Sequence, residues 1–145
     1  MDVLSYNSEA WDHEARSGGP WSRSVSAEEI QKARQGDLQF CHVPADWWPR
    51  LKGIDVLCLG SGGGQQVPKL VAAGASVTSL DNSDQQLQRD RDVAQREGLT
   101  LTTEKGDMSD LSRFSSGRFD LIYNPASNMF VEKLNPVWRE AYRVL

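Results

Sequence analysis

The stretch that decides the fold is VLCLGSGGGQQ, residues 56–66, where an apolar run breaks into glycines and then turns polar. Its four glycines directly follow a segment that is apolar enough to be fully buried. Glycine loses more conformational freedom on folding than any other residue, so a cluster of glycines here needs a reason. Two interpretations compete: a flexible surface loop, and a backbone cradle for a nucleotide-like ligand.

The composition is that of one globular domain, with 145 residues of which 25% are charged and 39% hydrophobic. A net charge of −4 argues against a basic surface, so we expect no nucleic-acid partner. No apolar run approaches the ~20 residues that cross a bilayer, and the N-terminus does not read as a secretory signal. We therefore expect no membrane association and a cytoplasmic location.

The cysteines and histidines give no sign of a metal site. Cys41 and Cys58 lie far apart, and His13 and His42 have no acid or nucleophile at a useful spacing. Metal sites typically use close-set pairs of such residues, so no metal ion is expected. Cys58 falls inside the apolar run and is predicted to be a small buried core residue.

Residues 1–52 differ from the rest in their predicted secondary structure, because they contain helical patterns and no convincing strand. A short helix is predicted within residues 8–19. A second helix is predicted within residues 25–36, where Ser26 and Glu29 have the spacing of a capping box. We expect a separate N-terminal helical segment.

From residue 53 onward, predicted strands and helices alternate. The expected strands are 55–60, 75–81, 99–107 and 118–124, and the expected helices are 65–74, 83–98 and 136–145. Strands separated by helices of this length predict a parallel sheet with right-handed crossovers. Residues 53–145 are therefore expected to form an α/β, Rossmann-like domain.

Three local features of these helices are also predicted. Ser83 and Gln86 have the spacing of a capping box at the start of the helix over 83–98. The alternating charges within that helix are typical of a solvated face. Asn135 is expected to cap the last helix, with Pro136 in its first turn.

The glycine cluster lies between the first strand and the first helix of this alternation. In open α/β sheets that loop sits at the carboxyl end of the strand, where ligands bind. Glycines permit positive φ there and let a ligand approach the backbone, which favours the cradle over a flexible loop. The dinucleotide fingerprint G-x-G-x-x-G is not met, because its sixth place, counted from Gly60, is Gln65.

Polar residues follow the later strands as well. Asp81 ends the second strand, where a carboxylate can accept hydrogen bonds from two ribose hydroxyls. It can equally serve as a helix cap or a solvated loop acid. Asp107 follows the third strand and can accept from an exocyclic amino group, with Met108 covering a base. Asn124 follows the fourth strand, and Asp120 within that strand needs a donor if it turns inward.

The sequence resembles the class I S-adenosylmethionine-dependent methyltransferases through four successive motifs: VLCLGSGGG, SLDNS, EKGDMSDL and FDLIYN. The resemblance covers residues 53–145, and the order of four motifs is more specific than any one glycine run. It implies a sheet of strand order 3-2-1-4 that binds S-adenosyl-L-methionine and releases S-adenosyl-L-homocysteine. The binding residues it implies are Gly60, Ser61, Gly62, Gly64, Gln65, Asp81, Asn82, Asp107, Met108 and Asn124.

The function implied is methyl transfer to a small-molecule acceptor, with residues 1–52 as a helical cap or lid that brings Trp11 and Trp21 to the donor pocket. No catalytic base is named, because an in-line displacement needs mainly alignment of donor and acceptor. The alternatives are a nucleoside-binding module without catalysis and, less favoured because of Gln65, an NAD-dependent oxidoreductase.

The sequence departs from the family pattern at three points, one of which is that the fourth motif, which often ends in an acid or an aromatic residue, continues here as NPAS, residues 124–127. Cys58 stands where many members carry an acid two residues before the first glycine. Family members also continue through three further strands, whereas this sequence stops at EAYRVL, residues 140–145. The fourth strand is then expected to be an open edge, and an open edge is a template for pairing with another chain. We expect self-association through that edge.

Overall fold

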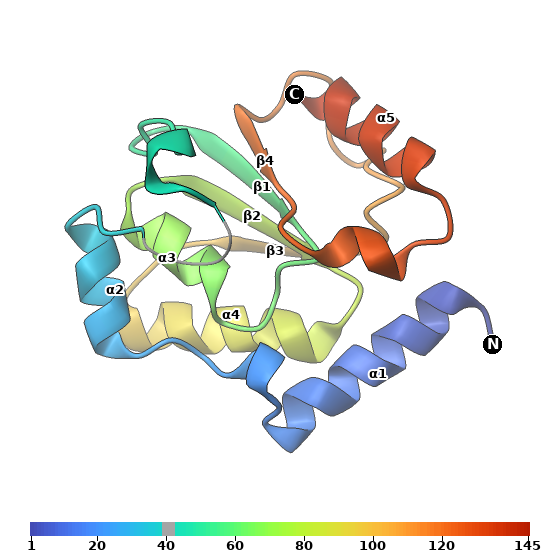
Figure 1. Cartoon of the computed structure of the whole chain (residues 1–145), viewed down its shortest axis with the longest axis horizontal. Coiled ribbons are helices and arrows are strands. Elements are labelled where there is room, and N and C mark those ends of the chain that lie inside the picture. The colour runs from blue at the N-terminus through green and yellow to red at the C-terminus, as the bar shows by residue number, and fades with distance from the viewer. Residues whose placement is uncertain (39–42) are drawn as a thin grey trace.

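The computed structural model describes residues 1–38 and 43–145, with a four-stranded parallel sheet at its centre (Figure 1). The strands are β1 (Asp55–Leu59), β2 (Ser76–Asp81), β3 (Thr102–Lys105) and β4 (Leu121–Tyr123). Their order is β3-β2-β1-β4 and every pair is parallel, which confirms the predicted α/β class and the 3-2-1-4 order. Cys41 and His42 lie outside the described residues.

Within residues 1–38 and 43–145, five α-helices accompany the sheet: α1 (Val3–Ser17), α2 (Ala27–Arg34), α3 (Gln66–Ala72), α4 (Asp84–Glu97) and α5 (Leu134–Val144). Short 3₁₀ turns cover Pro20–Ser22, Ala45–Trp47 and Ser127–Phe130. Figure 1 shows α5 beside β4 and α1 beyond the lower end of the sheet. Within the described part of the chain, none of the helices has the length and apolar character needed to span a membrane.

The sheet separates two apolar cores. Val56 and Cys58 of β1 pack on one face in a cluster that includes Leu70 of α3. Leu57 of β1 packs on the other face in a cluster that includes Val137 of α5. Successive residues of a strand point to opposite faces, so burial on both sides explains why β1 is a continuous apolar run. Cys58 is fully buried, as predicted.

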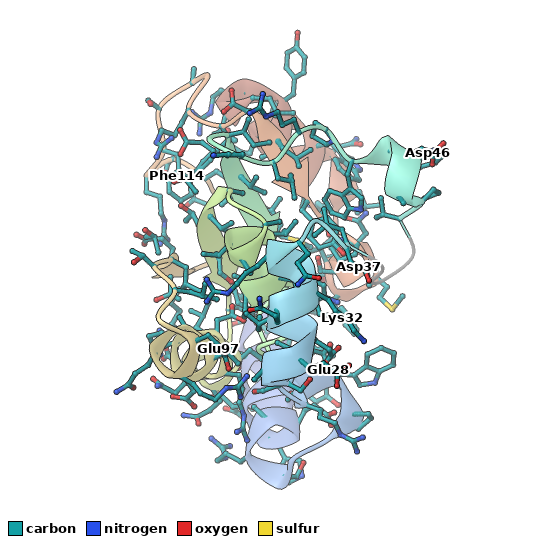
Figure 2. All side chains as sticks on the ribbon, turned by 90° about the vertical axis from the view of Figure 1, so that its left-hand side faces the viewer. Glu28, Lys32, Asp37, Asp46, Glu97 and Phe114 are labelled. Atoms are coloured by element: carbon teal, nitrogen blue, oxygen red, sulfur yellow. The ribbon has the colours of Figure 1, made fainter. Side chains whose placement is uncertain are left out.

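The N-terminal helices are fixed by their caps. α1 begins earlier than expected because the Asp2 side chain accepts a hydrogen bond from the Ser5 N–H at 2.8 Å. The predicted capping box of α2 is confirmed: the Ser26 side chain accepts from the backbone of Glu29, and the Glu29 side chain accepts from the backbone of Ser26. The outer face of α2 carries charged side chains (Figure 2).

Two predicted helix starts are wrong in detail. Ser83 caps α4 through the Gln86 N–H, but the Gln86 side chain turns away and donates to Ser22 Oγ at 2.7 Å, so the box is half formed. α5 begins at Leu134 rather than Pro136, and its N-cap residue Lys133 makes no side-chain cap.

The fourth strand is shorter than predicted. Only Leu121–Tyr123 pair with β1. Asp120 comes directly before β4 and bonds to Asp55, the first residue of β1. Its carboxylate faces outward and accepts from the Asp55 N–H at 2.8 Å, while its own N–H donates to the Asp55 carbonyl. Asp120 is exposed and precedes β4, so it does not turn inward and is not a buried carboxylate.

Candidate functional site

A cavity of about 180 Å³ lies at the carboxyl ends of the strands. It brings together most of the residues singled out in the sequence: Gly60, Ser61, Gly62, Gln65, Asp81, Asn82, Asp107 and Met108. Among the described residues, Gly64 and Asn124 stand outside this lining. The loops after β1, β2 and β3 therefore share one cavity, as expected for the carboxyl edge of a parallel sheet.

The glycine loop is held tightly by the protein itself. Gly60 has φ +56°, and a Cβ there would lie 2.6 Å from the Ser127 Cβ. A Cβ at Gly62 would lie 2.8 Å from the Gln86 Cβ. Real Cβ atoms do not approach so closely, so glycine is required at both positions by contacts within the fold. A flexible loop does not need such close packing.

The backbone N–H groups of this loop are also used internally. Gly60 donates to the Leu80 carbonyl and Gly63 to the Gln86 carbonyl. Gly62 and Gly64 donate to carboxylates, those of Asp81 and Asp90, at 3.0 and 2.8 Å. These four N–H groups are not available as an anion cradle of the kind that phosphate-binding loops present.

Asp81 is the central polar group of the cavity. It ends β2, only 7% of its surface is exposed, and its two carboxylate oxygens accept from the Gly62 and Ser83 N–H groups at 3.0 and 2.9 Å. Burial raises the pKa of Asp81, while these two hydrogen bonds oppose the rise. Each oxygen keeps a lone pair for a ligand, since a carboxylate has about four acceptor positions.

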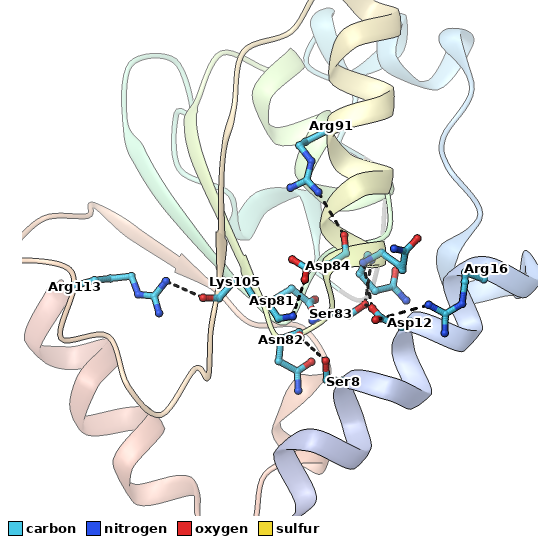
Figure 3. Close-up of polar contacts among 12 residues, drawn as sticks. Ser8, Asp12, Arg16, Asp81, Asn82, Ser83, Asp84, Arg91, Lys105 and Arg113 are labelled. Atoms are coloured by element: carbon cyan, nitrogen blue, oxygen red, sulfur yellow. Dashed lines mark hydrogen bonds and ion pairs between the residues drawn. The ribbon is translucent and has the colours of Figure 1, made fainter.

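The loop after β2 also anchors helix α1 (Figure 3). Ser8 Oγ donates to the Asn82 carbonyl at 2.8 Å, and Asn82 Nδ2 donates to the Leu4 carbonyl at 3.3 Å. Ser83 Oγ donates to Asp12 Oδ1 at 2.5 Å. The side chain of Asn82 thus faces both the cavity and the N-terminal helix.

Asp107 and Met108 close the side of the cavity next to β3. The Asp107 carboxylate accepts from the N–H and the Oγ of Ser109 at 2.9 and 2.7 Å, which orients it without burying it. Met108 is only 7% exposed and belongs to the apolar cluster on the α5 face of the sheet. An acid beside an apolar surface is suited to a heterocyclic base that carries an amino group.

Asn124 reaches the cavity only through its neighbours. Its Nδ2 donates to Asn128 Oδ1 at 2.9 Å, and its Oδ1 lies 2.5 Å from Ser127 Oγ. Ser127 lines the cavity and also lies 2.9 Å from the Leu59 carbonyl. Asn124 therefore orients a lining residue, and Ser127 is one of the residues after β4 that line the cavity.

An apolar wall completes the cavity on the side of the N-terminal segment. Trp11 and Trp21 line it, as the resemblance implied. Trp11 meets Phe130 edge-to-face with ring centroids 5.2 Å apart. Phe130, in the loop after β4, and Gln86 also line the cavity, although the sequence predicts no site role for Phe130 and only a capping role for Gln86.

Asp90 is the residue whose environment departs most from its sequence interpretation. It belongs to the charged stretch expected to be solvated, yet it is fully buried, and its carboxylate accepts from Gly64 and from Ser79 Oγ, each at 2.8 Å. Burial raises the pKa of Asp90 to about 7. The burial of Asp90 could have been predicted from its spacing, because it lies three residues from both Leu87 and Val93 and so falls on the apolar stripe of the helix.

No group of three or more metal-ligating side chains occurs within residues 1–38 and 43–145. The polar groups of the cavity are instead hydrogen-bond acceptors and amides set among apolar walls. That combination suits an organic ligand with several hydroxyl and amino groups.

Comparison with known proteins agrees with this geometry. A model of the methyltransferase domain family matches residues 57–145. The chain is 51% identical over 148 residues to the uncharacterized methyltransferase YbaJ of Bacillus subtilis, which covers 99% of this chain and 58% of that protein. It is 34% identical over 131 residues to the sterol 24-C-methyltransferase erg6 of Aspergillus fumigatus, which covers 88% of this chain and 31% of that protein.

The chain is also similar to a solved methyltransferase structure. The S-adenosylmethionine dependent methyltransferase from Mesorhizobium loti superposes with a TM-score of 0.61 and 28% identity, over 69% of this chain and 45% of that one. The chain thus spans 58% and 31% of the lengths of the two curated relatives. The resemblance carried by the four motifs is confirmed, and this chain belongs to the methyltransferase domain family.

Proposed function

We propose that this chain binds S-adenosylmethionine in the cavity at the carboxyl ends of the strands and is the donor-binding part of a methyltransferase for small molecules. The observation that carries the proposal is the buried Asp81 carboxylate, which borders the cavity and is tied to the glycine loop through Gly62. Family membership identifies the class of donor, and Asp81 supplies the group that would recognise its ribose.

The residues around the cavity fit this donor. The two free lone pairs of Asp81 match two neighbouring ribose hydroxyls. The Asp107 carboxylate would accept from the adenine amino group, and Met108 would cover the base. Around these groups we assign Asn82 beside the base, and Gly60, Ser61, Gly62 and Gln65 to the methionine part. Gly64 and Asn124, which stand outside the lining, would support it through Asp90 and Ser127.

When bound, S-adenosylmethionine supplies a methyl carbon that the acceptor attacks as the carbon–sulfur bond breaks, its electron pair remaining on sulfur. The chain's contribution is alignment: Asp81 fixes the ribose end, while Trp11 and Phe130 limit the access of water from the opposite wall. Holding two reactants in line is a large part of the barrier reduction for such a displacement. No side chain is assigned as a base.

The acceptor class is a small, largely apolar molecule. The apolar wall of the cavity supports this, with the aromatic side chains Trp11, Trp21 and Phe130. The sterol methyltransferase relative is consistent with it, since its name gives a sterol acceptor for that protein. An acceptor of this kind gains affinity by burying apolar surface.

Residues 1–52 are proposed to act as a lid over the domain formed by residues 53–145. Trp11 and Trp21 of this segment line the cavity of about 180 Å³, so movement of the N-terminal wall would widen the cavity for the donor. That wall is held by a few polar contacts, such as Ser83 to Asp12 and Ser8 to Asn82.

A cytoplasmic location remains part of the proposal.

Self-association through the β4 side is proposed for the chain of 145 residues. In the described sheet β4 pairs with β1 alone, and α5 beside it exposes Leu134, Trp138 and Tyr142, with Leu145 exposed directly after it. An unpaired edge next to apolar surface favours pairing with another chain.

The donor assignment is tested by calorimetric titration of the chain with S-adenosylhomocysteine, NAD and ATP. We expect binding heat from S-adenosylhomocysteine alone, and a thermal scan should show the matching stabilisation, ~2.7 kcal/mol at a hundredfold excess over the Kd. Heat from NAD alone would reassign the cavity to an oxidoreductase. Donor binding without methyl transfer to any apolar acceptor would support the binding-module alternative.

A further inference from the structure

We propose that Asp90 is a positioning residue for the donor site: its buried carboxylate fixes the glycine loop, and its charge state sets how tightly that loop holds the donor. The inference rests on the proposed function, because it concerns the same cavity. It adds a residue that lies outside the cavity lining and a dependence on pH.

The geometry makes Asp90 a junction between three segments. It projects from α4 with no exposed surface, and one oxygen accepts from the Gly64 N–H at 2.8 Å. The other oxygen accepts from Ser79 Oγ of β2, also at 2.8 Å. The Gly64 carbonyl in turn accepts from the Val25 N–H at 2.8 Å, which joins the N-terminal segment to the loop.

The junction lies beside the cavity wall, because Gln65, directly after Gly64, and Gly62, two residues before it, both line the cavity. Gly62, which lines the cavity, donates to Asp81, and the intervening Gly63 donates to the Gln86 carbonyl. The loop therefore crosses α4 between two buried carboxylates. Loosening it at Gly64 is transmitted to Gly62 because the chain between them is short and tightly packed.

The charge of Asp90 is finely balanced by its surroundings. Burial raises its pKa to about 7, against the hydrogen bonds from Ser79 and Gly64 that lower it. Asp81 at the end of β2 raises the pKa further, and Arg91 on the same helix lowers it. From β1 the Cys58 thiol faces the carboxylate, and burial raises the pKa of that thiol so that it stays neutral.

The two protonation states bond to the loop differently. The carboxylate accepts from both donors, and hydrogen bonds to an ionised acceptor are about twice as strong as neutral ones. In the acid form one oxygen carries a proton that must itself be donated, so the Ser79 hydroxyl must turn and the bond to Gly64 weakens. The loop is therefore held more firmly above pH 7 than below it.

The test follows the Gly64 amide by ¹⁵N NMR and S-adenosylhomocysteine affinity by calorimetry, both between pH 6 and pH 8. In the wild-type chain the amide shift should titrate near neutrality, and affinity should be about fivefold higher at pH 8. Asp90→Asn keeps the shape and an acceptor for Gly64 but cannot ionise. It should hold the affinity of the wild type at pH 6 at every pH, with no amide titration.

Ser79→Ala provides the second variant and keeps the test available if Asp90→Asn does not fold. It removes a hydrogen bond that favours the ionised form, so the midpoint of the Gly64 titration should move to higher pH. A Gly64 amide that does not titrate, or an Asp90→Asn chain that keeps the wild-type pH dependence of affinity, would overturn the proposal. Titration of Gly64 without donor binding at either pH would instead overturn the proposed function and leave the coupling of Asp90 to the loop established.

Discussion

The Asp81 carboxylate accepts a hydrogen bond from the Gly62 N–H at 3.0 Å, which ties the end of β2 to the glycine loop after β1. The relationship follows from the register of the sheet, in which Leu59, the last residue of β1, pairs with Leu80, the residue before Asp81. Two segments separated in sequence thus form one wall of the cavity. A ligand that bonds to Asp81 necessarily lies against the glycine loop.

Gly60→Ala should destabilise the fold more than Gly117→Ala. Both residues have positive φ, +56° and +65°, a conformation that costs an alanine ~1–2 kcal/mol. At Gly60 the new Cβ also meets Ser127 at 2.6 Å, whereas at Gly117 it meets nothing within 4 Å. Urea unfolding should give a loss of ~1 kcal/mol for Gly117→Ala and at least ~1 kcal/mol more for Gly60→Ala. Equal losses would mean that the loop is not tightly packed against Ser127.

Asp12→Ala should release helix α1 from the loop after β2. The Asp12 carboxylate accepts from Ser83 Oγ at 2.5 Å and from the Gln85 N–H at 3.2 Å, and hydrogen bonds to a charged group contribute ~1.5–3 kcal/mol each. Limited proteolysis should cut the N-terminal segment faster in this variant, and donor affinity should fall.

Arg16→Ala is the matched control for that change. Its ion pair with Asp12 spans 3.9 Å and the Arg16 side chain is 58% exposed, so its removal should change stability by no more than ~0.5 kcal/mol. If both variants were cut at the wild-type rate, the polar anchor of the lid would not depend on Asp12.

The stability of the chain should depend on pH through Asp90. Its pKa is 3.8 as a free side chain and about 7 in the fold, so between these values the folded state holds a proton that the unfolded state releases. The free energy of unfolding that Asp90 contributes is therefore full below pH 3.8 and is lost as the pH rises through about 7. Relative to Asp90→Asn, the wild type should lose on the order of 2 kcal/mol between pH 5 and pH 8.

Asp92→Asn gives the control on the same helix. Asp92 is exposed and accepts from Gln88, so its stability difference from the wild type should not change over this pH range. Urea unfolding of the three chains at both pH values measures the effect. A constant difference between wild type and Asp90→Asn would show that Asp90 does not titrate in this window.

Light scattering over a range of concentrations should show self-association. Trp138 on α5 is 47% exposed beside the β4 edge, and Trp138→Lys should reduce the mean mass at high concentration. Trp47 is 74% exposed but lies in the turn before β1, so Trp47→Lys should leave the mass unchanged. A monomer at every concentration would contradict association through the β4 side.

The sheet could be predicted because the sequence patterns that specify it, apolar strands alternating with helices, are local and agree with one another. An apolar run such as residues 56–59 can be satisfied only by burial on both faces, and the helices between such strands impose parallel pairing. The meeting of Asp81 with the glycine loop follows, since both lie at carboxyl ends of strands. Their order in the sheet, β2 beside β1, then determines the distance between them.

For two residues, Asp90 and Gln86, the prediction from sequence is wrong because their surroundings are formed by distant parts of the chain. Asp90 looks solvated beside Arg89 and Arg91, yet the helix turns it inward, where Ser79 and the glycine loop supply its donors. Gln86 has the spacing of a capping partner, but its side-chain amide donates a hydrogen bond to Ser22 Oγ of the N-terminal segment. Local patterns do not contain these partners, because tertiary packing brings them together.

The most direct test of the donor site is calorimetric titration of S-adenosylhomocysteine into the wild type, Asp81→Ala and Asp84→Asn. Asp81→Ala removes two charge-assisted hydrogen bonds to the ribose, so affinity should fall at least ~10-fold. Asp84, three residues on, is exposed and pairs with Lys105 at 2.6 Å, so Asp84→Asn should bind as the wild type does. Circular dichroism should show that all three are folded. Equal affinity for the wild type and Asp81→Ala would contradict the assignment of Asp81 and with it the proposed donor site.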